Sequence, residues 1–251
     1  VLVHLAAQAL REGKTVVYYT LELKDTVVGG RFDSCLTGVP LNEMRERKEE
    51  ILSKIDDIEG SLIIKEYPTK TASPNTIRKH LEKLKKQNRK IDMIIVDYAD
   101  LLRPAKTYKE KRNELESIYE DLRAIAQENH CSIWTASQIN RSGLNAEVVT
   151  MESISEAFNK CFVADFICSI SRTIKDKNSN QARMFIAKNR NGPDGLVFSM
   201  HMDTSCVKLQ VIDKSEIGNV ISASSPQELN DRLTSRRASE IYKKTRKERN
   251  I

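Results

Sequence analysis

The sequence predicts an α/β protein, in which a mostly parallel twisted sheet is flanked by helices and followed by an antiparallel extension. In the first half of the chain, short apolar runs rich in β-branched residues alternate with longer amphipathic patterns, which is typical of parallel strands joined by helices. In the second half, only short turns separate the apolar runs, as in antiparallel sheets. A chain of 251 residues is long enough for a large core of this kind.

The first half supplies the strands and helices of the parallel sheet. Strands are expected at residues 15–21, 61–65, 91–97 and 131–136, where apolar and β-branched residues follow one another. Helices are expected at 1–11, 41–58 and around 115–126, and after Asp25 and Ser73, which can each cap a helix. Pro74 strengthens the Ser73 signal, because proline is favoured at the first helical position. The lysines between residues 79 and 90 are expected to face solvent, with a nucleic-acid contact as the alternative.

The second half is expected to form the antiparallel extension. Apolar runs at 164–171, 182–187, 196–200 and 207–211 predict short strands, and residues 191–195 predict a hairpin or a bulged loop. We therefore expect one core over residues 1–213, a polar linker over 214–226 and a basic, helical tail over 227–251. The tail is expected to dock as a helix or to form an arm without fixed structure, and direct DNA contact is the alternative.

Composition excludes several classes of protein. No apolar run approaches the roughly 20 residues that span a bilayer, and no signal peptide opens the chain, which predicts a cytoplasmic protein without a membrane partner. The five cysteines are scattered and form no C-x-x-C pair, which argues against a zinc site and a disulfide framework. The formal charge of +6 is compatible with a polyanionic partner and does not establish one.

Polar residues follow the ends of three predicted strands. These residues are Glu22, Asp97 and Gln138. Since ligands bind at the carboxyl ends of the strands in open α/β sheets, the three side chains are expected to share one crevice. Phosphoryl transfer to water requires a carboxylate on Mg²⁺, a group that activates water and an amide near the γ-phosphate. For Asp97 taken alone, a capping or solvated aspartate is the alternative.

A tight turn in the second half offers positive charge for such a site. Lys188 and Arg190 stand at the start of the turn at 191–195. An arginine placed against a γ-phosphate would stabilise the charge of the transition state. From charge alone, an ordinary basic hairpin is the preferred interpretation.

Four segments together resemble the ordered motifs of the DnaB-type hexameric replicative helicases. They are YTLEL at 19–23, IIVDY at 94–98, SQINR at 137–141 and AKNRNGP at 187–193. The segment EYPT at 66–69 and the helix after it are closer to the T-even phage member of that family. The match runs in order from about Val1 to Leu209, and four motifs in series carry far more weight than any one of them.

The resemblance implies a RecA-like ATPase core that binds ATP and Mg²⁺, forms a homo-hexameric ring around single-stranded DNA and moves along it from 5′ to 3′. It implies that Glu22 activates water, that Asp97 is the Walker B aspartate on Mg²⁺ and that Gln138 reports the state of the γ-phosphate. Lys188 and Arg190 match the pair that reaches the nucleotide of the neighbouring subunit, with Arg190 as the arginine finger. Primase and a helicase loader are the protein partners that the resemblance implies.

The same resemblance suggests where DNA would bind. Arg141 and residues 142–159 fall where family members have DNA-contacting loops, although the match is loose there. The candidate DNA contacts are Arg141, Asn159 and Lys160.

One departure from the family concerns the phosphate-binding loop. The pattern G-x-x-x-x-G-K-[ST] does not occur in residues 1–251. That loop cradles the β- and γ-phosphates, so the chain as given is expected to bind ATP poorly and to belong to a longer protein that supplies the loop before Val1. Two alternatives remain open: a RecA-like recombinase or another ATPase on the same core, and a subunit that has lost hydrolysis and only binds DNA or partner proteins. The Asn-Gly-Pro sequence after Arg190 argues against the recombinase.

Overall fold

The computed structural model describes residues 1–106, 108–138, 149 and 159–212. These residues form two compact units. The first unit contains Val1–Gln138, residues 159–164 and Met202–Leu209, and the second contains residue 149, Asp165–His201 and residues 210–212. The linker expected at 214–226 and the tail expected at 227–251 lie outside the described residues.

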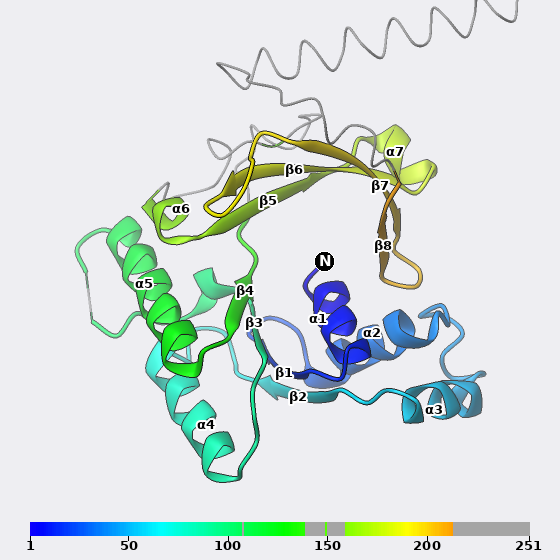
Figure 1. Cartoon of the computed structure of the whole chain (residues 1–251), viewed down its shortest axis with the longest axis horizontal. Coiled ribbons are helices and arrows are strands. Elements are labelled where there is room, and N and C mark those ends of the chain that lie inside the picture. The colour runs from blue at the N-terminus through cyan, green and yellow to red at the C-terminus, as the bar shows by residue number, and fades with distance from the viewer. Residues whose placement is uncertain (107, 139–148, 150–158, 213–251) are drawn as a thin grey trace, which may run out of the picture. The chain divides into compact units, whose positions relative to one another are not determined.

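A four-stranded parallel sheet forms the centre of the first unit (Figure 1). Its strand order is β2-β1-β3-β4, with β1 at Thr15–Thr20, β2 at Ser61–Glu66, β3 at Met93–Asp97 and β4 at Ser132–Thr135. Each neighbouring pair runs parallel, which confirms the predicted sheet. The connections between the strands pass through helices, because parallel neighbours need a crossover. The carboxyl ends of the four strands therefore lie along one edge of the sheet.

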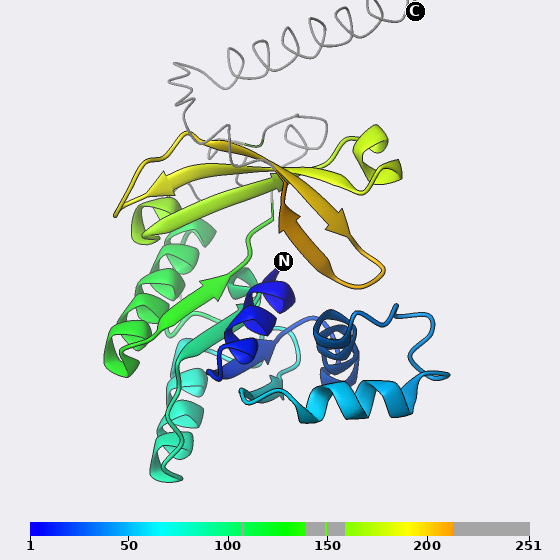
Figure 2. The same cartoon turned by 45° about the vertical axis from the view of Figure 1, so that its right-hand side comes forward.

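Helices cover both faces of this sheet. α1 (Leu2–Arg11) and α2 (Asp25–Thr37) pack against one face, and α4 (Pro74–Lys86) and α5 (Lys111–Asn129) pack against the other (Figures 1 and 2). Successive residues of a strand point to opposite faces, so Tyr18 packs with α1 and α2 while Tyr19 packs with α4 and α5. Burial on both faces explains why β1 and β3 are apolar along most of their length.

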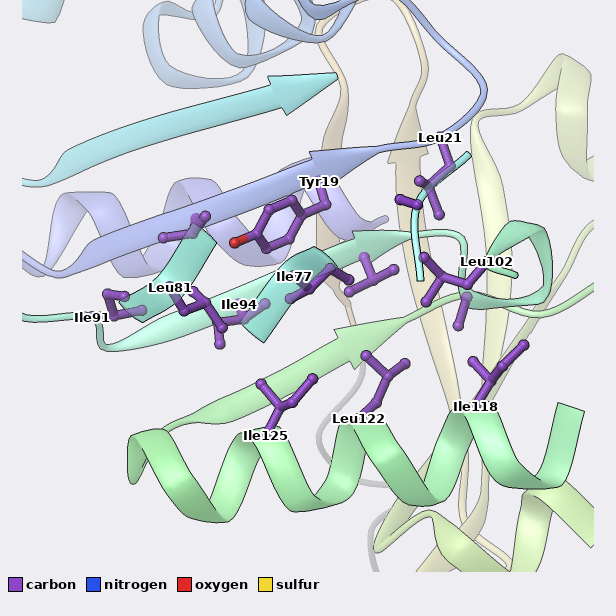
Figure 3. Close-up of a cluster of buried hydrophobic side chains, with 14 of the residues drawn as sticks. Tyr19, Leu21, Ile77, Leu81, Ile91, Ile94, Leu102, Ile118, Leu122 and Ile125 are labelled. Carbon is purple, nitrogen blue, oxygen red and sulfur yellow. The ribbon is translucent and has the colours of Figure 1, made fainter. Parts of the chain in front are cut away.

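Figure 3 shows the cluster between the sheet and the helices α4 and α5. Tyr19 and Ile94 of the sheet lie among side chains at helical spacing, which are Ile77 and Leu81 of α4 and Ile118, Leu122 and Ile125 of α5. The labelled side chains are each at most 7% exposed. This cluster fixes the positions of β1 and β3, whose ends carry the candidate site.

The helix start predicted at Ser73 is confirmed. The Ser73 hydroxyl accepts a hydrogen bond from the Thr76 N–H, the Thr76 hydroxyl accepts one from the Ser73 N–H, and Pro74 is the first residue of α4. The start predicted at Asp25 differs by one residue, because Lys24 is the N-cap of α2 and Asp25 is its first helical residue. The lysines of α4 are exposed, as expected.

The helix predicted at 41–58 is wrong in its first part. Residues 41–47 form turns, and α3 covers only Lys48–Asp56. The Arg47 guanidinium pairs with Glu43 at 2.9 Å and with Glu50 at 2.8 Å. This charge spacing is typical of a helix, and here the same pairs connect a turn to the first turn of α3. After β3 the chain forms a short 3-10 helix, η1 (Ala99–Leu101).

The predicted antiparallel sheet lies mainly in the second unit. Its order is β5-β6-β7-β8, with β5 at Phe166–Ser171, β6 at Gln181–Asn189, β7 at Val197–Asp203 and β8 at Lys208–Val211. β6 pairs antiparallel with both β5 and β7. The hairpin predicted at 191–195 joins β6 to β7, and Gly195 in it adopts φ +72°, a conformation that favours glycine.

A short helix between β5 and β6, α7 (Ile174–Asn178), has no counterpart in the sequence prediction. Asp176 lies in its first turn, is 1% exposed and accepts hydrogen bonds from the Thr173 hydroxyl and from Arg183 Nη2, each at 2.6 Å. Burial works to raise the pKa of Asp176, but these donors outweigh it and lower the pKa to about 2. The buried ion pair thus holds α7 against the sheet of its own unit.

All five cysteines are free thiols, and Cys35 and Cys161 are buried. Within the described residues, every helix is too short or too polar to cross a membrane.

Candidate functional site

The three polar strand-end residues lie at one edge of the parallel sheet. In the register of β1 and β3, Thr20 is opposite Asp97, and β4 ends beside β3. Glu22 and Gln138 follow the ends of β1 and β4 by a few residues. The N–H of Leu21 donates to the carbonyl of Asp97 at 2.9 Å, which ties the segment after β1 to the end of β3. The structure therefore brings Glu22, Asp97 and Gln138 to the same edge.

The carboxylate of Asp97 is oriented by the neighbouring strand. The hydroxyl of Tyr18 in β1 donates to Asp97 Oδ2 at 2.5 Å. Tyr18 is 1% exposed, and burial, together with the nearby Asp97 charge, raises the pKa of its phenol. The phenol stays protonated and remains a donor, so the carboxylate of Asp97 is held in one orientation.

Gln138 contacts Tyr98, and the charge of Glu22 influences Tyr98. Gln138 Nε2 donates to the Tyr98 hydroxyl at 2.9 Å. Burial raises the pKa of Tyr98, and the negative charge of Glu22 raises it further. Glu22 and Gln138 are themselves exposed, so a ligand at this edge has access to both.

Asp97 fits a magnesium ion that arrives with a nucleotide. The described part of the chain has no group of three or more His, Cys, Asp or Glu side chains that could hold a metal ion. Mg²⁺ bound to a triphosphate needs fewer protein ligands, because phosphate oxygens and water fill most of its octahedral shell. The single carboxylate of Asp97 is therefore compatible with Mg²⁺ that a nucleotide brings.

Lys160 belongs to a buried network at the same edge. It lies in α6 (Asn159–Val163), is 2% exposed and pairs through Nζ with Asp100 Oδ2 at 2.9 Å. The hydroxyls of Ser137 and Tyr119 donate to Asp100 at 3.1 and 2.8 Å. Burial raises the pKa of Tyr119, and the Asp100 charge adds to the effect. The Lys160 ammonium is thus paired with Asp100 in this structure, and a direct DNA contact by Lys160 stays a prediction.

The other candidate DNA contacts are only partly described. Arg141 lies outside the described residues, as do 142–148 and 150–158. Asn159 is the first residue of α6. A DNA contact by Arg141 or Asn159 stays a prediction.

Lys188 and Arg190 lie at the end of β6 in the second unit. Arg190 Nη1 pairs with Asp165 Oδ1 at 2.6 Å, and the Arg190 N–H donates to the Asp165 carbonyl at 2.9 Å. The Arg190 side chain is 47% exposed, so its guanidinium is not buried in its own chain. Lys188 is partly buried opposite Ile167 of β5. These two cations belong to the second unit, whereas the strand-end residues belong to the first unit.

The turn after Arg190 is braced by Asn189. The Asn189 Nδ2 donates to the Pro193 carbonyl at 3.3 Å, and its Oδ1 accepts from the Asn191 N–H at 3.3 Å. A Cβ on Gly192 would lie 2.8 Å from Asn189 Nδ2, so glycine allows the turn to close around this side chain. Arg190 is therefore presented by a short loop with internal hydrogen bonds.

Sequence patterns find the strand-end residues and miss the residues that hold them. Tyr18 lies inside an apolar strand, where a tyrosine is more often part of the core. Asp100 is one acid among many, and no local pattern pairs it with Lys160, which lies far along the chain. The one available signal is the position of Asp100 just after Asp97. A second carboxylate so close to a strand end indicates that a cation or a hydrogen-bond donor lies nearby.

Comparison with known proteins identifies the family. Residues 1–210 match the family described as DnaB-like helicase C terminal domain. The DnaB-like replicative helicase of Enterobacteria phage T4 is 30% identical over 203 residues, covering 76% of this chain and 43% of that protein. The replicative DNA helicase DnaB of Helicobacter pylori (strain ATCC 700392 / 26695) is 25% identical over 146 residues, covering 56% of this chain and 30% of that protein. The chain thus spans less than half the length of these two relatives.

Two solved structures share the fold. One, described as the ATPase domain of G40P, has a TM-score of 0.70 and 18% identity, and the alignment covers 84% of this chain and 80% of that one. The other, described as a DnaB-like replicative helicase and its interactions with primase, has a TM-score of 0.70 and 19% identity, with coverage of 84% and 56%. The likeness confirms the predicted RecA-like fold. Because the family match covers residues 1–210, the chain belongs to the DnaB-like helicase C-terminal domain family.

Proposed function

We propose that this chain is the ATPase domain of a replicative DNA helicase, which hydrolyses ATP to move from 5′ to 3′ on single-stranded DNA and to separate the duplex at a replication fork. The observation that carries the proposal is the convergence of Glu22, Asp97 and Gln138 at one sheet edge in a chain of this family. The family membership supports the helicase activity, and the strand-end chemistry supports ATP hydrolysis.

Each strand-end residue has a separate role in this proposal. Asp97, oriented by Tyr18, binds the Mg²⁺ that accompanies the β- and γ-phosphates. Glu22 accepts a proton from the attacking water. Gln138 donates to the γ-phosphate through the amide group that donates to Tyr98 in this structure, so nucleotide binding changes the hydrogen bonds of this side chain. This change lets the end of β4 respond to the presence of the γ-phosphate.

Arg190 supplies positive charge to the nucleotide of an adjacent copy of the chain. Its guanidinium is about half exposed at 47% and stands on a braced turn, so it can meet a phosphate on another molecule. Lys188, two residues earlier, adds a second cation. Positive charge at the γ-phosphate stabilises the transition state of phosphoryl transfer. The site is then shared between subunits, and we propose a homo-hexameric ring.

The relatives guide the proposal of partners. The T4 and Helicobacter pylori proteins are described as replicative helicases, and one structural neighbour is described together with primase. We propose single-stranded DNA as the track, with Arg141 and Asn159 as contacts, and primase and a helicase loader as protein partners. We place the protein in the cytoplasm, which is the host cytoplasm if a phage encodes it.

The test is unwinding of forked DNA. Residues 1–251 contain no phosphate-binding loop pattern, and we propose that they are part of a longer protein that supplies this loop. The assay uses that longer protein, called the loop-containing protein below. We expect ATP-dependent unwinding that requires a single-stranded 5′ tail and is lost in Glu22→Gln. Glu82→Gln removes an exposed acid from α4 and serves as the matched control.

Other outcomes would favour the alternatives. Strand exchange without unwinding would identify a recombinase. DNA binding with no ATP hydrolysis would identify a non-hydrolysing subunit and would refute the helicase proposal.

A further inference from the structure

We propose that Asp100 is a positioning residue, which joins the nucleotide-binding edge of the sheet to both flanks of the segment expected to contact DNA. The inference rests on the proposed function and deepens it, because it assigns the connection between the two activities to one carboxylate.

Asp100 contacts residues on either side of the segment at 139–158. Its Oδ2 accepts a hydrogen bond from the Ser137 hydroxyl at 3.1 Å and pairs with Lys160 Nζ at 2.9 Å. Ser137 lies just before that segment, and Lys160 lies just after it. One carboxylate oxygen therefore contacts a described residue on each side of that segment. We call Asp100, Ser137 and Lys160 the clasp.

The burial of Lys160 and Asp100 fixes the position of α6. The side chains of Lys160 and Asp100 are only 3% and 18% exposed. The hydroxyl of Tyr119 donates to the other oxygen of Asp100 at 2.8 Å, and Lys160 Nζ lies 5.9 Å from the centre of the Tyr119 ring. A buried charge that loses its partner is strongly destabilising, so a shifted α6 would leave two charges unpaired.

The clasp is continuous with the proposed nucleotide site. Asp100 lies in η1, directly after the strand that ends at Asp97. Between them Tyr98 accepts the hydrogen bond from Gln138, and Gln138 is the neighbour of Ser137. Ser137 is thus the covalent neighbour of the residue proposed to contact the γ-phosphate, and its hydroxyl donates to Asp100. We infer that a displacement of Gln138 on nucleotide binding is passed through Ser137 and Asp100 to α6.

A second tether shows that α6 is anchored as a unit. Arg123 of α5 donates through Nη1 to the carbonyl of Val163, the last residue of α6. Lys160 holds the first turn of α6 to η1, and Arg123 holds its end to α5. Of these two tethers, the clasp is the one that also includes a residue next to Gln138.

The test uses two single variants and their combination. Asp100→Asn and Lys160→Met each leave one buried charge without its partner, whereas Asp100→Asn/Lys160→Met removes both charges. Two quantities are measured in the loop-containing protein: amide hydrogen exchange of residues 159–164, and the ratio of ATP turnover with and without single-stranded DNA. Urea unfolding gives the stability of each variant.

We expect about tenfold faster exchange of residues 159–164 in both single variants, because α6 loses its anchor. We expect the DNA-stimulation ratio to fall by about tenfold in the same variants. The double variant is expected to recover stability, because neither charge is left unpaired. The DNA-stimulation ratio of the double variant should stay low, because the thioether of methionine cannot replace the ion pair that ties α6 to η1.

Arg183→Met is the matched control, since it breaks another buried ion pair, that with Asp176. It should lower stability and leave the ratio unchanged.

Two results would overturn the proposal. One is unchanged exchange of residues 159–164 in both single variants. The other is recovery of the ratio together with stability in the double variant, which would reduce the clasp to a packing contact. If the unchanged loop-containing protein shows no DNA-stimulated hydrolysis, the proposed function fails instead, and the exchange measurement still decides whether Asp100 holds α6.

Discussion

The guanidinium of Arg190 forms an ion pair with the carboxylate of Asp165 at 2.6 Å, and the two side chains are 47% and 52% exposed. An exposed pair of this kind contributes little to stability, because water screens both charges. It can orient the guanidinium and still release it to a phosphate, which offers more charge and several acceptor oxygens. An arginine held in this way can bind a phosphate on another molecule.

The first prediction concerns this cation. Arg190→Ala should change the free energy of unfolding by less than about 1 kcal/mol and should lower DNA-stimulated ATP hydrolysis of the loop-containing protein by about a thousandfold or more. Urea unfolding measures the free energy of unfolding, steady-state turnover measures ATP hydrolysis, and a fluorescent ATP analogue measures ATP binding. We expect ATP binding to remain largely intact. Arg172→Ala, in the same unit, controls for the loss of one charge. Unchanged turnover in Arg190→Ala would exclude the shared site.

The second prediction concerns the hydroxyl that orients Asp97. Tyr18→Phe removes the donor to Asp97 and should raise the Mg²⁺ concentration for half-maximal ATP hydrolysis by about tenfold, because the metal ligand loses its support. Tyr19→Phe is a matched control: it deletes a hydroxyl from the next residue of β1, where the partner is His80 Nδ1 at 2.9 Å on the other face. Both variants should lose about 1 kcal/mol of stability. A Mg²⁺ titration that shifts equally in both would show that the effect is not specific to Asp97.

The third prediction compares one chemical change at two glycines. A Cβ on Gly60 would lie 2.4 Å from the carbonyl oxygen of Leu10, so Gly60→Ala forces α1 away from β2 and should cost about 2 kcal/mol. A Cβ on Gly29 in α2 would lie 3.9 Å from its nearest neighbour, Ile64 Cδ1, so Gly29→Ala should stabilise the chain by about 0.5 to 1 kcal/mol. Urea unfolding of residues 1–251 measures both. Equal effects of the same sign would contradict the packing described for α1.

The fourth prediction is a pH dependence that comes from Asp176. Its pKa in the folded chain is lowered from an ordinary 3.8 to about 2, so it contributes stability that is fully present above pH 4 to 5 and is lost as the pH falls through 2. The shift corresponds to about 2 kcal/mol at neutral pH. The difference in unfolding free energy between the unchanged chain and Asp176→Asn should therefore be constant from pH 5 to 7 and should shrink at lower pH. A difference that grows on acidification would have the wrong sign.

The parallel sheet and its core could be predicted because the responsible signals are local. The strands at β1 and β3 are apolar runs, and Ser73-Pro74 carries a complete helix start within a few residues. The carboxyl ends of parallel strands meet at one edge for topological reasons, so Glu22, Asp97 and Gln138 could be grouped from their positions along the chain. The helix predicted at 41–58 was too long because ion pairs at helical spacing also form across the turn before α3.

The remaining parts of the site depend on contacts between distant residues. Lys160 is a basic residue beside the segment expected to contact DNA, yet its side chain is buried. Only the fold shows that Asp100 is its partner. The pairing of Arg190 with Asp165 likewise joins residues that no local pattern connects. Hydrophobic periodicity locates elements, but it carries no information about which charged side chains meet.

Mixing two inactive variants tests whether one chain supplies Glu22 and its neighbour supplies Arg190. Glu22→Gln and Arg190→Ala chains of the loop-containing protein are coexpressed with different tags and purified as mixed assemblies. About one quarter of the interfaces should then combine an intact Glu22 with an intact Arg190, and ATP hydrolysis should return to a measurable fraction of the unchanged rate. Arg190→Ala chains mixed with Glu22→Gln/Arg190→Ala chains should regain nothing. Mixed assemblies as inactive as either variant alone would contradict the shared site.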